Sequence, residues 1–323
     1  MQIKKWAKRI GFGLLGLLLS AILIGVIYEQ VERNKAGKYI ESRKGAFVDV
    51  GGYELYYEKE GTGAPTVIFE SGFPGDHRAW INSYIRKEVS KQATTLIYDR
   101  PGLLWSGGGD RPQTAESLSN NLYQLLQNGG FEKPYILVGH SAAGIYFRPF
   151  IKQHQEDILG VVLLDASHPD QVFNASPEIK KLMSPPITPT KWMLDIANNT
   201  GLMRFATKDP LIFNSVKNGG IYQGIKFLKE ESSKESPKIS FGDVPLVVFS
   251  AGQAPAMTKD TALLKQMHDY WDALQADIAK ASTNSKRIVS DSANHNSLPY
   301  IERKRILNEI LQMIPVQDSI ALE

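Results

Sequence analysis

The chain of 323 residues contains no cysteine. Disulfide bonds and thiolate metal sites are therefore excluded. An oxidising compartment is compatible with this lack. The sequence also has no internal repeat and no low-complexity tract. With 42% hydrophobic and 22% charged residues, it has an ordinary globular balance and ample length for one large core.

The chain also lacks the basic surface expected of a protein that binds nucleic acid. Its net charge is +3, and four cations in the first nine residues more than account for it. The rest of the chain carries one net negative charge. It shows no patch of interleaved aromatic and basic residues, and the charged run 226–238 mixes both signs as a solvated face does. We therefore expect no nucleic-acid partner.

One long hydrophobic run is present near the start of the chain. Residues 10–28 carry no charge and are about long enough to cross a bilayer as one helix. A cleaved signal peptide would need a shorter apolar region followed by a small-x-small site, so an uncleaved single-pass anchor is favoured and cleavage stays the alternative. The positive-inside rule then places residues 1–9 in the cytoplasm and the main domain on the extracytoplasmic side of the cell membrane. Residues 29–45 are charged and predict a short tether.

Residues 46–315 predict an α/β domain. Two β-rich segments, 46–50 and 53–60, are joined by Gly51 and Gly52, which is typical of a hairpin. Short β-rich runs then alternate with helical periodicity, which indicates a mostly parallel sheet with helices on both faces. The expected strands are 66–70, 94–98, 135–138, 160–164, 245–250 and 287–290, and the expected helices are 114–128, 144–155, 259–281 and 302–314.

Residues 169–242 interrupt this alternation, because they contain no convincing strand. A structureless loop of that length is improbable in a compact domain. We expect an inserted helical cap over the carboxyl edge of the sheet, and the alternative is an extra helical layer away from any site. Some of its large apolar residues are expected to bury against one another, and those that face the sheet, Trp192 for example, are expected to line an apolar small-molecule pocket. These residues are Trp192, Met193, Leu194, Met203, Phe205 and Phe213.

A serine lies where one predicted strand turns into a helix. The apolar run 135–138 breaks into the small residues around Ser141, a pattern typical of a nucleophile elbow, where the strained serine is exposed at the bend. The G-x-S-x-G pattern would place glycine at position 143, where this chain has Ala143 followed by Gly144. Amides at the start of the following helix point at developing negative charge. The alternative is a serine in an ordinary strand–helix turn.

A serine nucleophile needs a base, and the base needs an orienting acid. Of six histidines, His295 lies in a polar loop directly after the last predicted strand, at the same sheet edge as Ser141. Asp165 ends the strand that follows the elbow helix and is the favoured acid. The strand 245–250 is followed by no carboxylate before Asp260, which is the second candidate. A structural role for His295 or Asp165 is the alternative.

The glycine-rich turn after strand 66–70 is the candidate oxyanion hole. It could bring the backbone amide of Phe73 towards the serine, where the amide of Ala142 would be its partner. A plain tight turn is the alternative, because such a sequence requires no function.

Taken together, these segments resemble the α/β-hydrolase fold superfamily. The elbow 139–144, the turn 71–75, residues 99–102 after the next strand and the His295 loop follow that superfamily's order, over about residues 46–315. The resemblance implies Ser141 as nucleophile, His295 as base and the amides of Phe73 and Ala142 as the oxyanion hole. Most members carry the acid after the strand corresponding to 245–250, and some carry it where Asp165 stands.

The expected function is that of a membrane-anchored serine hydrolase. Its partners would be a small-molecule carboxylic ester and the bilayer around residues 10–28, and neither a cofactor nor a metal is implied. An amidase or peptidase of the same fold is one alternative, because fold does not separate these activities. A non-catalytic binding or signalling protein that keeps the fold is the other.

Overall fold

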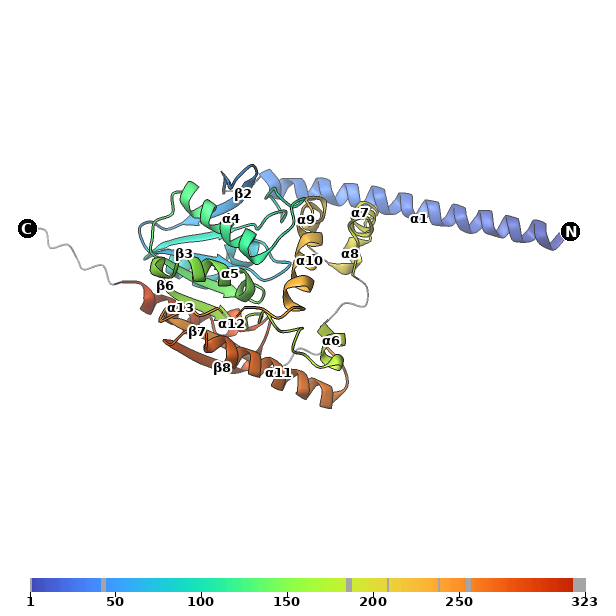
Figure 1. Cartoon of the computed structure of the whole chain (residues 1–323). Coiled ribbons are helices and arrows are strands. Elements are labelled where there is room, and N and C mark those ends of the chain that lie inside the picture. Colours follow the sequence, from blue (N-terminus) through green and yellow to red (C-terminus); the bar gives the residue numbers. More distant parts are fainter. Residues whose placement is uncertain are drawn as a thin grey trace, which may run out of the picture.

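The computed structural model describes residues 2–41, 45–183, 188–207, 209–237, 239–253 and 257–315. At its centre lies an eight-stranded sheet of order β1-β2-β4-β3-β5-β6-β7-β8 (Figure 1). Strand β2 pairs antiparallel with β1 and with β4, and the pairs from β4 to β8 are parallel. The sheet is therefore mostly parallel with an antiparallel hairpin at one edge, as predicted. The strands are β1 Ala46–Asp49, β2 Glu54–Glu60, β3 Thr66–Glu70, β4 Thr94–Tyr98, β5 Tyr135–His140, β6 Ile158–Leu164, β7 Leu246–Gln253 and β8 Ser285–Asn294.

Helices cover both faces of the sheet. Along β3, Ile68 faces the cluster that α4 and α5 cover, whereas Val67 and Phe69 face the cluster that α2, α3 and α13 cover. Side chains alternate between the faces of a strand, so a strand buried on both sides is apolar throughout. The covering elements are α2 Arg78–Ile81, α3 Tyr84–Val89, α4 Ala115–Asn128, α5 Ala143–Gln153, the 3-10 turn η1 Gln155–Asp157, α11 Thr261–Ala279, α12 Leu298–Ile301 and α13 Arg303–Met313.

The predicted strands and helices are all present, with the largest boundary errors near the functional edge. Strands β3 and β4 have the predicted bounds, whereas β5 runs on to His140 because its last residues still pair with β6. Strand β8 begins at Ser285 and ends at Asn294, well outside the predicted 287–290. Its flanking residues are polar and their strand conformation comes from pairing with β7.

A helical insertion separates β6 from β7, as predicted. It lies at the carboxyl edge of the sheet (Figure 1). Its apolar side chains form a small cluster of their own with Leu103, from the loop after β4. We call these helices the cap: α6 Pro177–Met183, α7 Lys191–Asn199, α8 Met203–Ala206, α9 Ile212–Lys217 and α10 Gly220–Ser232.

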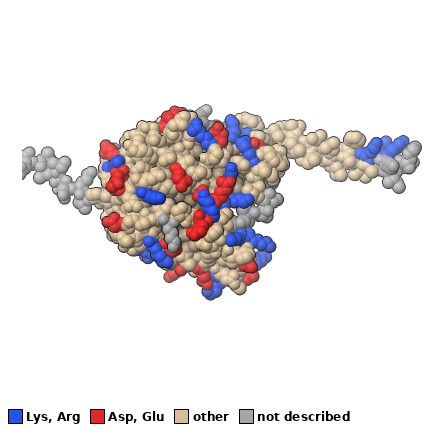
Figure 2. Space-filling view, viewed as in Figure 1, with Lys and Arg blue, Asp and Glu red and all other residues tan. Residues whose placement is uncertain are grey.

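The chain begins with a single long helix, α1 Gln2–Glu41. The stretch Lys5–Gly37 is long and apolar enough to cross a membrane, with a mean hydropathy of 2.6 in its most apolar window and none of that window buried. Figure 2 shows blue cations near the free end of α1 and then a stretch with no charged side chain before the main body.

Residues 29–41, most of the segment predicted as a tether, continue the helix α1. The helix continues to Glu41, and residues 42–44 lie outside the described residues. Charged side chains one turn apart support the helix here: Arg33 Nε lies 2.9 Å from Glu29 Oε1, and Lys35 Nζ lies 2.7 Å from Glu32 Oε1. Contacts of Glu29 and Arg33 with the cap also stabilise the helix. They could not be predicted from this segment, because their partners lie far away in the sequence.

Candidate active site

Ser141 occupies a strained turn between β5 and α5. Its φ is +56°, in the left-handed region that residues other than glycine rarely adopt. A Cβ on Gly139 would lie 2.7 Å from the Ala143 Cβ and 2.8 Å from the Phe147 ring. Glycine is therefore needed at 139, and with glycine there the Ala143 methyl is accommodated. The departure from the usual pattern at 143 leaves the elbow intact.

Three predicted residues from separate segments meet at this edge of the sheet. His295 Nε2 lies 3.0 Å from Ser141 Oγ, and His295 Nδ1 lies 2.6 Å from Asp165 Oδ2. An ionised carboxylate only accepts, so Nδ1 carries the proton and Nε2 is free to accept from the serine hydroxyl. The arrangement can therefore take a proton from Ser141 and stabilise the resulting imidazolium.

Asp165 is held from its other side by the end of β7. It is 1% exposed, and its Oδ1 accepts from the Ala251 amide and from Trp271 Nε1, both at 3.0 Å. The second candidate acid, Asp260, is exposed and caps α11, where its carboxylate accepts from the amides of Ala262 and Leu263. The carboxylate missing after β7 is thus replaced by one from β6 that bonds to the β7 backbone.

His140 contributes to the site in a way that sequence reasoning missed. Its Nε2 lies 2.9 Å from the carbonyl oxygen of His295, and because a carbonyl only accepts, this nitrogen carries the proton. Burial, with a smaller effect of His295, lowers the pKa of His140 to about 4. A neutral His140 therefore holds the backbone of the loop that carries His295. Its place beside Ser141 in the sequence carries no signal for a contact 155 residues away.

The glycine-rich turn after β3 lies against the serine. A Cβ on Gly72 would come within 2.6 Å of the Ser141 Cβ, so only glycine permits this approach. Gly72, Phe73 and Ser141 line the same cavity, and Ala142 follows directly as the first residue of the α5 turn. The turn that contains Phe73 therefore lies beside Ser141, and Ala142 is the next residue in the chain.

A buried arginine holds that turn in place. Arg100 donates to the carbonyl oxygens of Ser71, at 2.6 Å, and Gly75, at 3.0 Å. Its guanidinium pairs with the buried carboxylate of Glu70, which also accepts from the Tyr98 hydroxyl. Burial raises the pKa of Glu70, and the Arg100 cation opposes that rise. The sequence pattern after β4 included Arg100 but did not predict this bridge.

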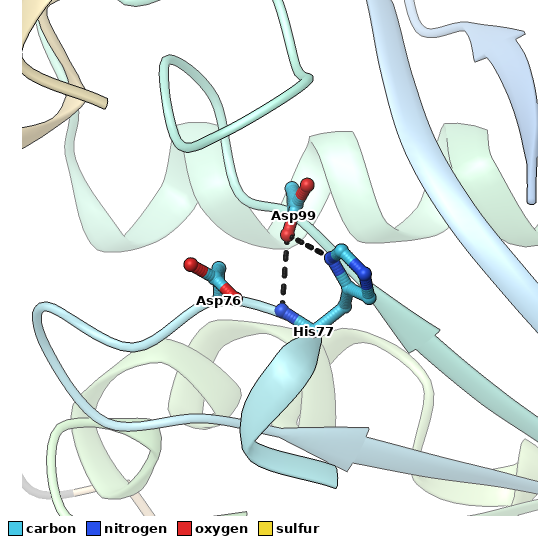
Figure 3. Close-up of side chains that lie close together, drawn as sticks. All are labelled: Asp76, His77 and Asp99. Carbon is cyan, nitrogen blue, oxygen red and sulfur yellow. Dashed lines mark hydrogen bonds and ion pairs between the residues drawn. The ribbon is translucent and has the colours of Figure 1, made fainter. Parts of the chain in front are cut away.

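A second polar cluster fixes the segment after the turn (Figure 3). Asp76, His77 and Asp99 are buried and their ligand atoms lie within 4.8 Å of one another, close enough to hold a metal ion. Hydrogen bonds occupy them: Asp99 Oδ1 accepts from His77 N at 2.9 Å and from Nδ1 at 2.8 Å, and Asp76 binds the Arg78 guanidinium. Arg78 also pairs with Asp209 of the cap at 2.7 Å. We interpret the cluster as a brace between the β3 turn, the end of β4 and the cap.

Two cavities border the serine and His295. One, of about 620 Å³, also has Trp80, Tyr84 and Tyr300 in its wall. The other, of about 260 Å³, extends on the Asp165 side. Its wall includes one cap residue, Met183, together with Met257, Met267 and Trp271.

The expectation that Trp192 forms part of the pocket wall is wrong. Trp192 and Phe205 border neither cavity and are 63% and 91% exposed. Helix α7 packs through Leu194 against the apolar cluster that the cap forms with Leu103. Trp192 is therefore left on the outer side of the helix. The amphipathic sequence of α7 does not predict which side of the helix faces the sheet.

Comparison with known proteins agrees with this fold. Residues 65–208 match a family model described as the alpha/beta hydrolase fold. An uncharacterized protein of Bacillus subtilis, YbdG, is 26% identical over 164 residues, which are 50% of each chain. The chain spans half or less of the length of the first curated relatives that it matches.

Two solved structures are similar over most of both chains. An esterase from Thermogutta terrifontis has a TM-score of 0.57 at 18% identity and covers 84% of this chain and 97% of its own. An epoxide hydrolase from Bacillus megaterium has a TM-score of 0.61 at 17% identity and covers 83% and 99%. At such identities the likeness concerns the fold. Because the family match over residues 65–208 and the sheet topology agree with it, we conclude that the chain has the α/β-hydrolase fold.

Proposed function

We propose that the chain is a membrane-anchored serine hydrolase that cleaves carboxylic esters. The observation that carries this proposal is the hydrogen-bonded series Ser141–His295–Asp165, with distances of 3.0 and 2.6 Å, at the border of two cavities. A serine hydroxyl becomes a nucleophile when a base of this kind accepts its proton.

The reaction would proceed in two steps. Ser141 Oγ attacks the ester carbonyl while His295 Nε2 takes its proton, and the oxyanion is stabilised by the amides of Phe73 and Ala142. The tetrahedral intermediate collapses, and the imidazolium gives the proton to the leaving alcohol. Water then attacks the acyl-enzyme, His295 takes its proton, and the acid leaves as Ser141 recovers its hydrogen.

The nucleophile favours an ester over an epoxide as substrate, although solved neighbours of both kinds are similar in fold. Attack of a serine oxygen on an epoxide carbon would form an ether. A water molecule activated by His295 has no carbonyl to attack in an ether, so the enzyme would stop after one turnover. Attack on an ester carbonyl forms an acyl-enzyme that water can cleave.

Anchoring is supported by α1. Its uncharged stretch follows Lys5, Lys8 and Arg9, so the cations would remain in the cytoplasm and the hydrolase domain would lie on the other side.

A fluorophosphonate probe applied to the purified full-length protein tests the chemistry. The probe should label the wild type covalently, and Ser141→Ala should abolish labelling and lower the turnover of short p-nitrophenyl esters by roughly a millionfold. Ser83→Ala is the matched control, because Ser83 borders the same cavity and its side chain caps no helix. Labelling that persists in Ser141→Ala would contradict the proposal. Turnover of a p-nitroanilide faster than of the matched ester would favour an amidase instead.

A further inference from the structure

We propose that the outer corner of the cap rests on the lipid bilayer beside the point where α1 emerges from it. We call this surface the cap corner and define it as Trp192, Ile196, Leu202 and Phe205. The proposal builds on the membrane anchoring put forward above and adds a second, independent contact between the protein and lipid.

The cap corner exposes large apolar side chains on two consecutive helices. Trp192 and Ile196 lie one turn apart on α7 and are 63% and 52% exposed. Leu202 and Phe205, at α8, are 54% and 91% exposed. Four such residues within a stretch of fourteen form a patch that a water-soluble surface seldom carries without a partner.

The same two helices are docked on α1. A Cβ on Gly25 would come within 2.3 Å of the carbonyl oxygen of Thr200, so glycine allows the helices to touch. Arg204 Nε lies 2.8 Å from Glu29 Oε2, and Arg33 Nη2 donates to the carbonyl of Asn198 at 2.7 Å. Figure 1 shows α7 and α8 next to α1, at the end of the body from which α1 projects. The cap corner thus has a defined position along the anchor helix.

That position is the level of the membrane surface. At about 1.5 Å per residue, the uncharged run 10–28 is about as long as the ~30 Å hydrocarbon core. Gly25 lies three residues before the end of this run, so its contact with Thr200 is about one helical turn inside the boundary. Aromatic and aliphatic side chains are favoured at this depth.

The charged side chains at the contact between α1 and the cap are paired with one another. Glu29, directly after the uncharged run, is 2% exposed and is paired with both Arg33 and Arg204. A paired and buried carboxylate opposes the approach of lipid far less than a free one does. The bilayer is therefore the occupant that the position, the apolar side chains and the paired charges favour together.

Spin labels on single cysteines test the proposal, and the absence of native cysteine makes each label unique. The full-length protein is reconstituted in phosphatidylcholine vesicles with a nitroxide at Phe205→Cys, Leu17→Cys or Asn308→Cys. Collisions with membrane-soluble oxygen and with a water-soluble nickel chelate are then compared. Leu17 is an exposed residue of the anchor, and Asn308 is an exposed residue of α13 in the hydrolase domain.

In vesicles, we expect the label at Phe205→Cys to collide often with oxygen and rarely with the nickel chelate. The label at Asn308→Cys should stay accessible to the nickel chelate. A Phe205 label as accessible to nickel as the Asn308 label would overturn the cap-corner proposal. If the Leu17 label stays accessible to nickel as well, the anchoring itself fails; if it does not, anchoring stands and only the cap corner fails. Dipolar broadening between Phe205 labels would identify a second copy of the chain as the occupant and would also overturn the proposal. Leu202→Cys serves as a second labelling site at the same corner.

Discussion

At the scale of single residues, the proposed acid of this site is held in place by two hydrogen-bond donors. Asp165 reaches His295 from the end of β6, while Ala251 N and Trp271 Nε1 bind its other oxygen. These donors keep the carboxylate oriented so that it accepts from His295 Nδ1. Orientation of this kind determines which imidazole tautomer faces the serine.

Asp165→Asn should lower kcat for a short ester by roughly 10⁴-fold, because an amide in this position favours the wrong imidazole tautomer. Steady-state kinetics at neutral pH provide the measurement. Asp260→Asn is the matched control and should change kcat little, since asparagine caps a helix about as well as aspartate. Equal losses in the two variants would remove Asp165 from the proposed role.

His140 links the pH dependence of stability to the site. Its pKa of 6.5 in an unfolded chain falls to about 4 in the folded protein. Between these values the unfolded state binds a proton that the folded state does not, so the stabilisation present above pH 6.5 is lost as the pH falls through about 4. The shift corresponds to about 3 kcal/mol.

His140→Gln should flatten this dependence, because its amide can donate to the His295 carbonyl and does not titrate. The free energy of unfolding, measured with denaturant at pH 7 and at pH 4.5, should fall more for the wild type than for His140→Gln. Parallel pH profiles in the two proteins would contradict the role of His140 titration.

At the scale of elements, the contact between α1 and the cap depends on one glycine of the helix. Gly25 faces the carbonyl oxygen of Thr200, whereas a Cβ on Gly16 would meet nothing within 4 Å. Both glycines lie inside the same helix, so substitution changes helix propensity alike at the two positions. The difference between them isolates the docking of α1 on the cap.

Gly25→Val should therefore destabilise the full-length protein by about 1–3 kcal/mol through overpacking, and Gly16→Val should not. Unfolding of the detergent-solubilised protein, followed by intrinsic fluorescence, measures the difference. A Gly16→Val loss as large as that of Gly25→Val would mean that α1 does not dock on the cap as described.

At the scale of the whole molecule, the proposed anchoring through α1 would set the orientation of the hydrolase domain relative to a membrane. The helix projects from the body at the end where the cap lies, and its free end bears the cations (Figures 1 and 2). An anchor in this orientation would hold the cap side towards the lipid.

The full-length protein should sediment with membranes and resist extraction by carbonate, because the uncharged run is long enough to span the hydrocarbon core. Protease added to cells stripped of their wall or outer membrane should digest the hydrolase domain. A cytoplasmic protein digested only after lysis serves as the control. Complete protection of the domain, in a preparation where detergent makes it cleavable, would reverse the proposed orientation.

The sequence by itself determined the elements whose signals are local. Strands such as β3 and β4 are apolar throughout because both sheet faces are covered, and the small residues around Ser141 are what a crowded bend requires. The order of strands also brought Ser141, Asp165 and His295 to one edge, because the carboxyl ends of parallel strands meet there.

Tertiary structure alone decided what depends on partners far apart in the chain. The polar ends of β8 are strand only because β7 pairs with them, and residues 29–41 are helix partly because the cap binds Glu29 and Arg33. The links from His140 to the His295 loop and from Arg100 to the β3 turn follow from the same cause. Which side of α7 faces outward was also decided by tertiary structure. An amphipathic pattern shows that a helix has an apolar and a polar side, but it does not show which neighbour each side contacts.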